Sequence, residues 1–213
     1  IGLAGEESSV TISGRGTLTG GAGKAHILTG EASLNISGWT DANAGTVTIT
    51  VPALSTADAT FVGNNEIANV TTLGGEDSVT TGAANDIIDT GADDDSISSG
   101  AGNDNIDAGA GDDVITGTSG ADTITGGTGA DTFAYTSSAE LMAATGAADA
   151  VIDLVDGKGG TADIVEVTGS VSVGVAGSDT LARITNVEKF VAASHANGSD
   201  NLSHVFTIGS NAA

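Results

Sequence analysis

The sequence contains no cysteine, one proline and very few aromatic residues, namely four Phe, one Tyr and one Trp. Without cysteine there is no disulfide framework, which is compatible with a cytosolic protein or with an exported bacterial one. The scarcity of large rings argues against a thick core and favours thin β layers of Ala, Val, Ile and Leu. No run of about 18 apolar residues is present, so the sequence predicts no membrane insertion.

Basic residues are scarce as well, because five Lys and Arg residues face 28 Asp and Glu residues, for a net charge of −23. Between Lys24 and Lys158 there is no Lys or Arg at all. Nucleic acid is therefore excluded as a natural partner, since phosphate binding requires clustered cations. So acidic a segment repels itself unless cations join it. Regularly spaced Val and Ile argue against disorder, and a divalent cation is the expected remedy.

Glycine is abundant, with 33 residues, and much of it belongs to a repeat. Residues 72–134 divide without insertion into seven nonapeptides, which read TLGGEDSVT, TGAANDIID, TGADDDSIS, SGAGNDNID, AGAGDDVIT, GTSGADTIT and GGTGADTFA. Position six is always aspartate and position eight is always apolar. The aspartates are Asp77, Asp86, Asp95, Asp104, Asp113, Asp122 and Asp131. The apolar residues are Val79, Ile88, Ile97, Ile106, Ile115, Ile124 and Phe133.

Each nonapeptide divides into a strand and a turn. Positions seven to nine predict a short strand whose middle side chain points inward and whose neighbours, such as Ser96 and Ser98, point outward. Positions one to six predict a turn in which glycine permits a positive φ and a close approach of carbonyl oxygens. Stacked turns gather carboxylate and carbonyl oxygens along an edge. Such hard ligands, without Cys or His, select Ca²⁺ over zinc or copper.

This pattern resembles the RTX (repeats-in-toxin, hemolysin-type calcium-binding) family, whose consensus is G-G-x-G-x-D-x-U-x. The resemblance implies an all-β fold, a calcium-stabilised parallel β-roll in which two nonapeptides form one coil. Loops then stack on loops 18 residues away, and ions bound between neighbouring loops number about five. The position-six aspartates would be the side-chain ligands, four on one edge of the roll and three on the other. The glycines expected to take part are Gly82, Gly91, Gly100, Gly102, Gly109, Gly111, Gly120, Gly127 and Gly129.

The repeats depart from the consensus in several loops. Leu73 and Thr118 replace the second glycine in the first and sixth repeats, and Ala84 and Asp93 replace the glycine of position four. A Cβ at position four is expected to be strained where φ is positive. Sites between coils that protein oxygens saturate leave no open position for a substrate, so the predicted calcium is structural.

Three regions are expected from the composition and the repeat. They are a β-rich N-terminal region with assembly contacts at 1–62, the calcium-binding β-roll at 63–134, and a β-rich C-terminal cap or assembly region at 135–213. Phe61 and Val70 fall in register with the apolar position eight, so the roll is expected to begin before the first nonapeptide, as coils without calcium loops.

Further elements are predicted on both sides of the nonapeptides. The capping-box pattern Ser137-Ser138-Ala139-Glu140 predicts one short helix near 138–145. The predicted strands are Ser8–Ser13, Gly16–Thr19, Ala25–Thr29, Ala32–Ser37, Thr46–Val51, Thr60–Val62, Ala150–Val155, Asp163–Thr168, Ser170–Val175, Ala182–Thr185 and Glu188–Ala192.

No catalytic constellation stands out. There is no Gly-x-Ser-x-Gly elbow, no His-Glu-x-x-His motif and no phosphate-binding loop. His195, His204 and Asp200 can be combined with a serine on paper, but serine is too abundant for that match to carry weight. Neighbouring carboxylates could suit a glycosidase, yet the repeat assigns Asp95 and Asp113 to calcium. We therefore predict no catalytic residue and no enzyme activity.

Two classes of function remain. The first is an extracellular structural protein, namely a subunit or segment of a self-assembling surface layer, fibre or adhesin. Its expected partners are copies of itself, and a cell-surface polysaccharide is a possible further partner. The second is a folding and secretion module of a larger secreted protease, lipase or alginate epimerase. A toxin fragment is disfavoured, because pore formation requires amphipathic helices.

The family resemblance implies an extracellular or cell-surface location, type I secretion from a Gram-negative bacterium, and an uncleaved C-terminal signal. The chain begins at Ile1 without an initiator Met or a signal-peptide pattern, which indicates a processed product or a fragment. Calcium binding and folding are expected to be coupled, since the acidic loops repel one another without the ion.

Overall fold

The structure is a computed structural model that describes a set of segments spread over the whole chain. The described segments are 8–11, 17–19, 25–28, 33–35, 46–50, 58–63, 65, 67–136, 153–160, 162–168, 183–192 and 204–207. The helix expected near 138–145 and the strand expected at Ser170–Val175 lie outside these segments. Among the described residues, no helix is long and apolar enough to cross a membrane.

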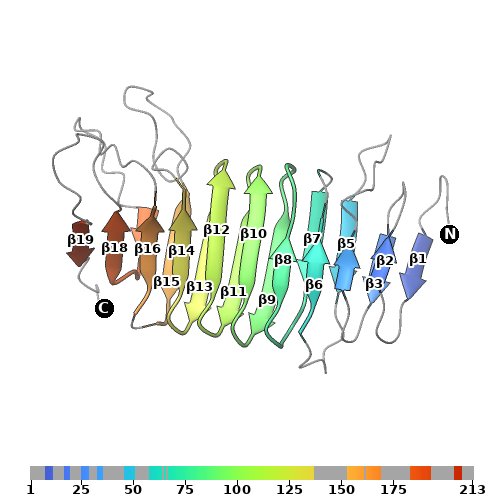
Figure 1. The fold of residues 1–213 in the computed structure, drawn as a ribbon, viewed down its shortest axis with the longest axis horizontal. Helices are drawn as coiled ribbons and strands as arrows, with labels where there is room; N and C mark the ends of the chain where they lie inside the picture. The colour runs from blue at the N-terminus through green and yellow to red at the C-terminus, as the bar shows by residue number, and fades with distance from the viewer. Residues whose placement is uncertain are drawn as a thin grey trace.

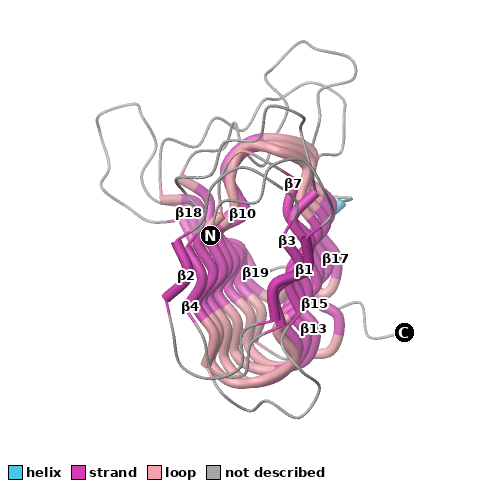
Figure 2. Tube along the Cα trace, turned by 90° about the vertical axis from the view of Figure 1, so that its right-hand side faces the viewer, coloured by secondary structure: helices cyan, strands magenta, loops and turns pink. Residues whose placement is uncertain are grey.

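The strands form two sheets that face each other along the whole length of the molecule (Figure 1 and Figure 2). The nine-stranded sheet contains β1 (Ser8–Thr11), β3 (Ala25–Leu28), β5 (Thr46–Thr50), β7 (Ile67–Thr71), β9 (Ile87–Ala92), β11 (Asn105–Ala110), β13 (Thr123–Thr128), β15 (Leu154–Lys158) and β17 (Ile184–Thr185). The ten-stranded sheet contains β2 (Thr17–Thr19), β4 (Ser33–Asn35), β6 (Thr60–Val62), β8 (Ser78–Thr80), β10 (Ser96–Ala101), β12 (Val114–Ser119), β14 (Thr132–Tyr135), β16 (Ile164–Val167), β18 (Lys189–Ala192) and β19 (His204–Thr207).

From β1 to β18 the described strands alternate between the two sheets, so the chain winds as a coil with two strands per turn (Figure 2). Every strand pair is parallel except that of β18 and β19. In the nonapeptide segment, Ile106 pairs with Ile88 and with Ile124, each 18 residues away. The predicted all-β fold, a parallel β-roll with two nonapeptides per coil, is confirmed.

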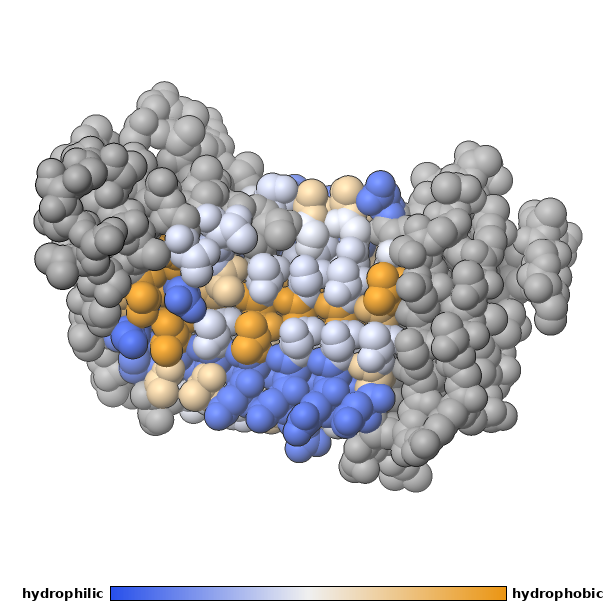
Figure 3. Space-filling view, in the orientation of Figure 1, coloured by the Kyte–Doolittle hydropathy of each residue, from blue (hydrophilic) through white to orange (hydrophobic). Residues whose placement is uncertain are grey.

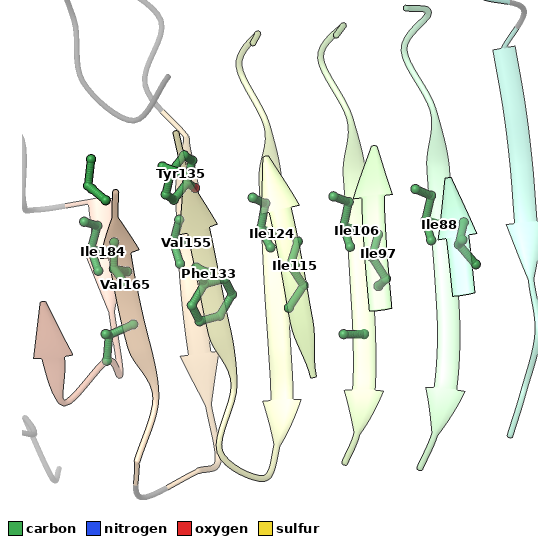
Figure 4. Packing of buried hydrophobic residues seen from close by; sticks show 14 of the residues in the cluster. Ile88, Ile97, Ile106, Ile115, Ile124, Phe133, Tyr135, Val155, Val165 and Ile184 are labelled. Atoms are coloured by element: carbon green, nitrogen blue, oxygen red, sulfur yellow. The ribbon is translucent and has the colours of Figure 1, made fainter. Parts of the chain in front are cut away.

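One or two apolar side chains from each strand between β6 and β18 fill the space between the sheets (Figure 4). The strand over Ser78–Thr80 is exposed, buried and exposed in turn, as alternation along a strand requires. Its middle residue, Val79, and the equivalent residues of the other six nonapeptides are at most 1% exposed. Burying one such side chain stabilises the fold by about 1.5–3 kcal/mol. One buried apolar residue for every nine is a thin core, so the loops must contribute to stability as well.

The sheets continue across both boundaries expected for the roll, at 62/63 and at 134/135. On the N-terminal side, Phe61 pairs with Val79 and Val70 pairs with Ile88, so coils precede the first nonapeptide as expected. On the C-terminal side, the segments 153–160, 162–168 and 183–192 add two further coils. Strand β19 alone runs antiparallel, along the outer side of β18.

Candidate metal centre

The position-six aspartates stand immediately before a strand, at two opposite edges of the roll (Figure 1). On the first edge, the loops lead into β8, β10, β12 and β14, and on the second edge they lead into β9, β11 and β13. The 18-residue period predicts this placement. We call these aspartates the inner row. Its first-edge members are Asp77, Asp95, Asp113 and Asp131, and its second-edge members are Asp86, Asp104 and Asp122.

One oxygen of each inner-row carboxylate is used to link two coils. The backbone N–H of Asp95 donates to Asp113 Oδ1 at 2.8 Å, and that of Asp104 donates to Asp122 Oδ1 at 2.9 Å. The same bond joins the other inner-row pairs. At the N-terminal end the donors are the N–H groups of Ala59 and Ala68, which have no carboxylate to continue the row. The inner row is therefore a ladder that begins with the first two nonapeptides.

The second oxygen of most inner-row carboxylates is buried and has no hydrogen-bond partner. The inner-row side chains are between 0 and 3% exposed. The unpartnered atoms of the inner row are the Oδ2 atoms of Asp77, Asp86, Asp95, Asp104, Asp113 and Asp131. A buried carboxylate oxygen without a partner is costly, so a cation or a proton must compensate for its charge.

Burial raises the pKa of every inner-row carboxyl group above its ordinary value of 3.8. The pKa rises to about 7 for Asp95 and to about 6 for Asp104, Asp113, Asp122 and Asp131. The loss of hydration is the largest cause, and neighbouring carboxylates add to it. Without a positive partner the charged form is thus disfavoured, and a bound cation reverses this balance.

A second row of side chains lies next to the inner row, at position five. Asp94 Oδ1 accepts the N–H of Asp112, and Asp112 Oδ1 accepts the N–H of Ala130, both at 2.8 Å. On the second edge, Asn85 and Asn103 make the equivalent bonds. The side chains of Asn85, Asp94, Asn103 and Asp112 are exposed to solvent. We call these four residues the outer row. The loops with its acidic members lead into β10 and β12, and the edge where these strands begin is the lower, hydrophilic edge in Figure 3.

Backbone oxygens also line the stacked loops, because glycine lets neighbouring loops approach closely. A Cβ added to Gly111 would collide with the carbonyl oxygen of Asp93, and one added to Gly120 would collide with that of Gly102. Both glycines have a positive φ, which an L side chain rarely adopts. The same holds for most of the glycines predicted from the repeat, namely Gly91, Gly100, Gly102, Gly109, Gly127 and Gly129. Gly82 contributes through its carbonyl oxygen, which accepts the N–H of Ala101 at 2.8 Å.

The loops that depart from the consensus differ in backbone conformation. Asp93 at position four has φ of 78°, which confirms the expected strain, and Leu73 at position two has φ of 82°. Ala84, also at position four, is not among the residues with a positive φ. The prediction of strain at Ala84 was therefore wrong, because the backbone of Ala84 does not adopt the positive φ that Asp93 adopts at the same repeat position. A non-glycine residue with a positive φ, such as Asp93 or Leu73, lowers the stability of the fold by about 1–2 kcal/mol.

The donor set fits a hard divalent cation. Among the described residues, no group of three or more His, Cys, Asp or Glu side chains is close enough to hold a metal. Between two stacked loops, the oxygens available are two unpartnered carboxylate oxygens and the nearby carbonyl oxygens. Ca²⁺ accepts such mixed sets of six to eight oxygens, whereas Mg²⁺ requires a stricter octahedron. The inner-row carboxylates and the glycine-rich backbone would therefore hold Ca²⁺ and neutralise the buried charges.

The ladder extends beyond the nonapeptides to two aspartates that the sequence analysis did not select. Asp122 donates its N–H to Asp153 Oδ1 at 2.8 Å, and Asp131 donates its N–H to Asp163 Oδ1 at 2.9 Å. These pairs are 31 and 32 residues apart instead of 18. The signal that could have revealed them is an aspartate two residues before an inward-facing Val155 or Val165, which repeats the spacing of positions six and eight.

The alternative sites considered from the sequence lie only partly within the described residues. His26 lies on β3 and His204 on β19, at opposite ends of the roll (Figure 1). His195 and Asp200 lie outside the described residues. Asp112 and Asp113 are adjacent in sequence, but one is exposed and the other is buried, so they do not form a facing carboxylate pair.

A family model for the RTX calcium-binding nonapeptide repeat, in four copies, matches residues 71–106 and 98–133. The match covers the segment in which the inner row was found, and it confirms the predicted resemblance. Proteins with these repeats bind Ca²⁺ and are typically secreted to the outside of the cell. No curated protein and no solved structure matches the chain.

Proposed function

Because residues 71–133 are RTX calcium-binding repeats, we propose that the chain is an extracellular structural protein in which Ca²⁺ drives both folding and assembly. It would act as a subunit or segment of a bacterial surface layer, fibre or adhesin. The observation that carries this proposal is the continuous coil, in which a thin apolar core is combined with a row of buried carboxylates. Such a molecule is a calcium-dependent rod rather than a scaffold built around a pocket.

The distribution of charge supports the role of Ca²⁺ in assembly. The chain carries a net charge of −23, and about five divalent ions would offset about ten of these charges. Exposed acidic residues also remain on the first edge, at Glu76, Asp94 and Asp112. Calcium could bridge these residues to the acidic surface of a second copy, which makes copies of this chain the proposed partners.

The proposal includes no enzyme activity of the chain. Its support is that the carboxylates of the repeat link coils and are buried, rather than meeting at an accessible pair. Export by the type I route from a Gram-negative bacterium and anchoring on a cell-surface polysaccharide belong to the same proposal. The high calcium concentration outside the cell would fold the chain only after export.

The proposal is tested by titrating Ca²⁺ into the chelator-treated protein while far-UV circular dichroism and light scattering are recorded together. We expect the β signal and the scattering to rise together. If the β signal rises alone, the folded chain is a monomer and the role of a folding and secretion module in a larger enzyme is favoured. If neither signal responds, calcium does not drive folding.

The N-terminal strands provide a second test. β1 pairs only with β3 in the described structure, so its other side is an edge at which a further strand could pair. We expect deletion of residues 1–13 to reduce calcium-dependent scattering without abolishing the β signal. Unchanged scattering would exclude this edge from the assembly contact.

A further inference from the structure

Asp163 lies outside the nonapeptides and occupies the next rung of the first-edge ladder. It stands immediately before β16, which pairs with β14, and its Oδ1 accepts the N–H of Asp131 at 2.9 Å. The segment between these coils, residues 137–152, separates Asp163 from the repeat in sequence. The family model ends at residue 133, so the match does not include Asp163.

The carboxylate of Asp163 is fully buried, and only one of its two oxygens accepts a hydrogen bond. Its side chain is 0% exposed, and its Oδ2 has no hydrogen-bond partner. The neighbouring rung, Asp131, is also 0% exposed and also has an unpartnered Oδ2. Lys158, the basic residue of the same coil, is exposed to solvent. Two buried carboxylate oxygens therefore lie on successive rungs, each without a hydrogen bond.

Glycines keep the space around Asp163 free, and oxygen atoms border that space. A Cβ added to Gly160 would lie 2.5 Å from Asp163 Oδ1 and 2.9 Å from Asp163 Oδ2, and it would collide with the carbonyl oxygen of Gly129. A Cβ added to Gly157 would collide with Asp163 Oδ2 and with the carbonyl oxygen of Asn186. Oxygens from three successive coils thus converge on the Asp163 carboxylate.

The surroundings of Asp163 are negatively charged. Its backbone N–H donates to Glu188 Oε2 at 2.9 Å, so the Glu188 carboxylate lies on the side of Asp163 that faces away from the nonapeptides. Asp131, Glu188 and Asp156 all act on Asp163 electrostatically, and each disfavours its charged form. A buried carboxylate in negative surroundings, bordered by the carbonyl oxygens of Gly129 and Asn186, favours a cation with hard-ligand preference.

We propose that a divalent cation of the calcium type binds between the loops of Asp131 and Asp163, with both carboxylates and the Gly129 carbonyl oxygen among its ligands. This ion fastens the coil of β15 and β16 to the last nonapeptide. It also neutralises the end of the carboxylate ladder, where Glu188 replaces aspartate. The proposal shares calcium chemistry with the proposed function but does not depend on assembly.

The test counts the bound ions. Equilibrium dialysis with radioactive Ca²⁺ at saturation compares the wild type with Asp163→Asn and with the control Glu166→Gln. Glu166 is on β16 between the buried Val165 and Val167, so it points away from the core, and its substitution removes one charge from the same coil. We expect Asp163→Asn to bind one ion fewer per chain and Glu166→Gln to bind the wild-type number.

An unchanged number of ions in a folded Asp163→Asn variant would overturn this inference, while the calcium sites of the nonapeptides would remain. Absence of bound Ca²⁺ in the wild type would overturn both the inference and the proposed function. If Asp163→Asn does not fold, anomalous diffraction from calcium- or terbium-loaded wild-type crystals decides. A peak beside Asp163 Oδ2 and the Gly129 carbonyl oxygen supports the site, and peaks confined to the nonapeptide loops exclude it.

Discussion

Two rows of side chains run side by side along the first edge of the roll, and they differ in how deeply they are buried. Asp112 of the outer row and Asp113 of the inner row are neighbours in sequence, and each accepts one backbone hydrogen bond from an adjacent coil at 2.8 Å. Asp112 is exposed, whereas Asp113 is 1% exposed and keeps an unpartnered Oδ2. Both carboxylates are thus hydrogen-bonded to a neighbouring coil, and the burial of the inner row creates the need for a cation.

The second edge supports this interpretation. There the outer row consists of Asn85 and Asn103, which make the same bonds to the neighbouring coil without carrying a charge. The inner row of that edge is still aspartate, at Asp86, Asp104 and Asp122. In the outer row, an amide oxygen can therefore accept the hydrogen bond that links two coils. In the inner row, a carboxylate oxygen accepts it on both edges.

The largest effect is expected from removing calcium. Chelation should abolish most of the β signal in far-UV circular dichroism at neutral pH, because the inner-row carboxylates then repel one another in a buried position. Restoring Ca²⁺ should restore the signal. A chelated chain that keeps its β signal at pH 7.5 would contradict the account, since the inner row would then be stable without a cation.

Lowering the pH should partly replace calcium in stabilising the folded chain. Folding raises the pKa of every inner-row carboxyl group, from 3.8 to about 7 for Asp95 and to about 6 for Asp104 and Asp113. The folded chain therefore binds more protons than the unfolded chain between these values. The free energy of unfolding of the chelated chain therefore falls as pH rises from about 4 to 7. We expect the β signal in chelator to increase as the pH is lowered from 7.5 to about 5.

High salt at pH 7.5 is the control for this acid effect. Salt screens the repulsion between exposed charges, including those of the outer row, but it supplies no proton to a buried carboxyl group. We expect salt to restore much less β signal than acid does. An equal response to salt and acid would mean that the net charge, and not the inner row, destabilises the chelated roll.

Substitution of a glycine in the loop that holds Asp112 and Asp113 should destabilise the stacking of that loop on its neighbour. Gly111 precedes Asp112 and Asp113 and has φ of 147°. Alanine there would collide with the carbonyl oxygen of Asp93, so we expect Gly111→Ala to destabilise the calcium-loaded roll by about 1–3 kcal/mol. Thermal unfolding in saturating Ca²⁺ measures this. Ala83→Gly, at an exposed loop position, is the control and should change stability much less.

The smallest effect is expected at the first nonapeptide, where an ordinary side chain occupies a position that favours glycine. Leu73 has φ of 82°, and its replacement by glycine removes a conformational cost of about 1–2 kcal/mol at the expense of extra chain entropy. We expect Leu73→Gly to leave stability unchanged or to raise it by up to about 1 kcal/mol. A clear loss of stability would show that the Leu73 side chain contributes packing that outweighs its strain.

The regular part of this structure could be predicted from the sequence, because seven nonapeptides fix both the strand register and the stacking of Asp113 on Asp95. Asp153 and Asp163 were not predicted, since the residues inserted after β14 change the spacing from 18 to 31 and 32. The pairing of Val165 with Phe133 shows that Val165 faces inward and places Asp163 on the same ladder. The local backbone was less predictable. Asp93 and Ala84 both replace the glycine of position four, yet Asp93 has a positive φ and Ala84 does not.

Calcium-dependent folding requires the carboxylates of the buried inner row and not those of the exposed outer row, and one paired titration tests this most directly. Asp113→Asn and Asp112→Asn each keep the oxygen that accepts the backbone hydrogen bond and remove one negative charge. Calcium-dependent folding is followed by circular dichroism for both variants and for the wild type. We predict that Asp113→Asn raises the calcium midpoint about tenfold or more, while Asp112→Asn stays close to the wild type. Equal midpoints for the two variants would contradict the claim.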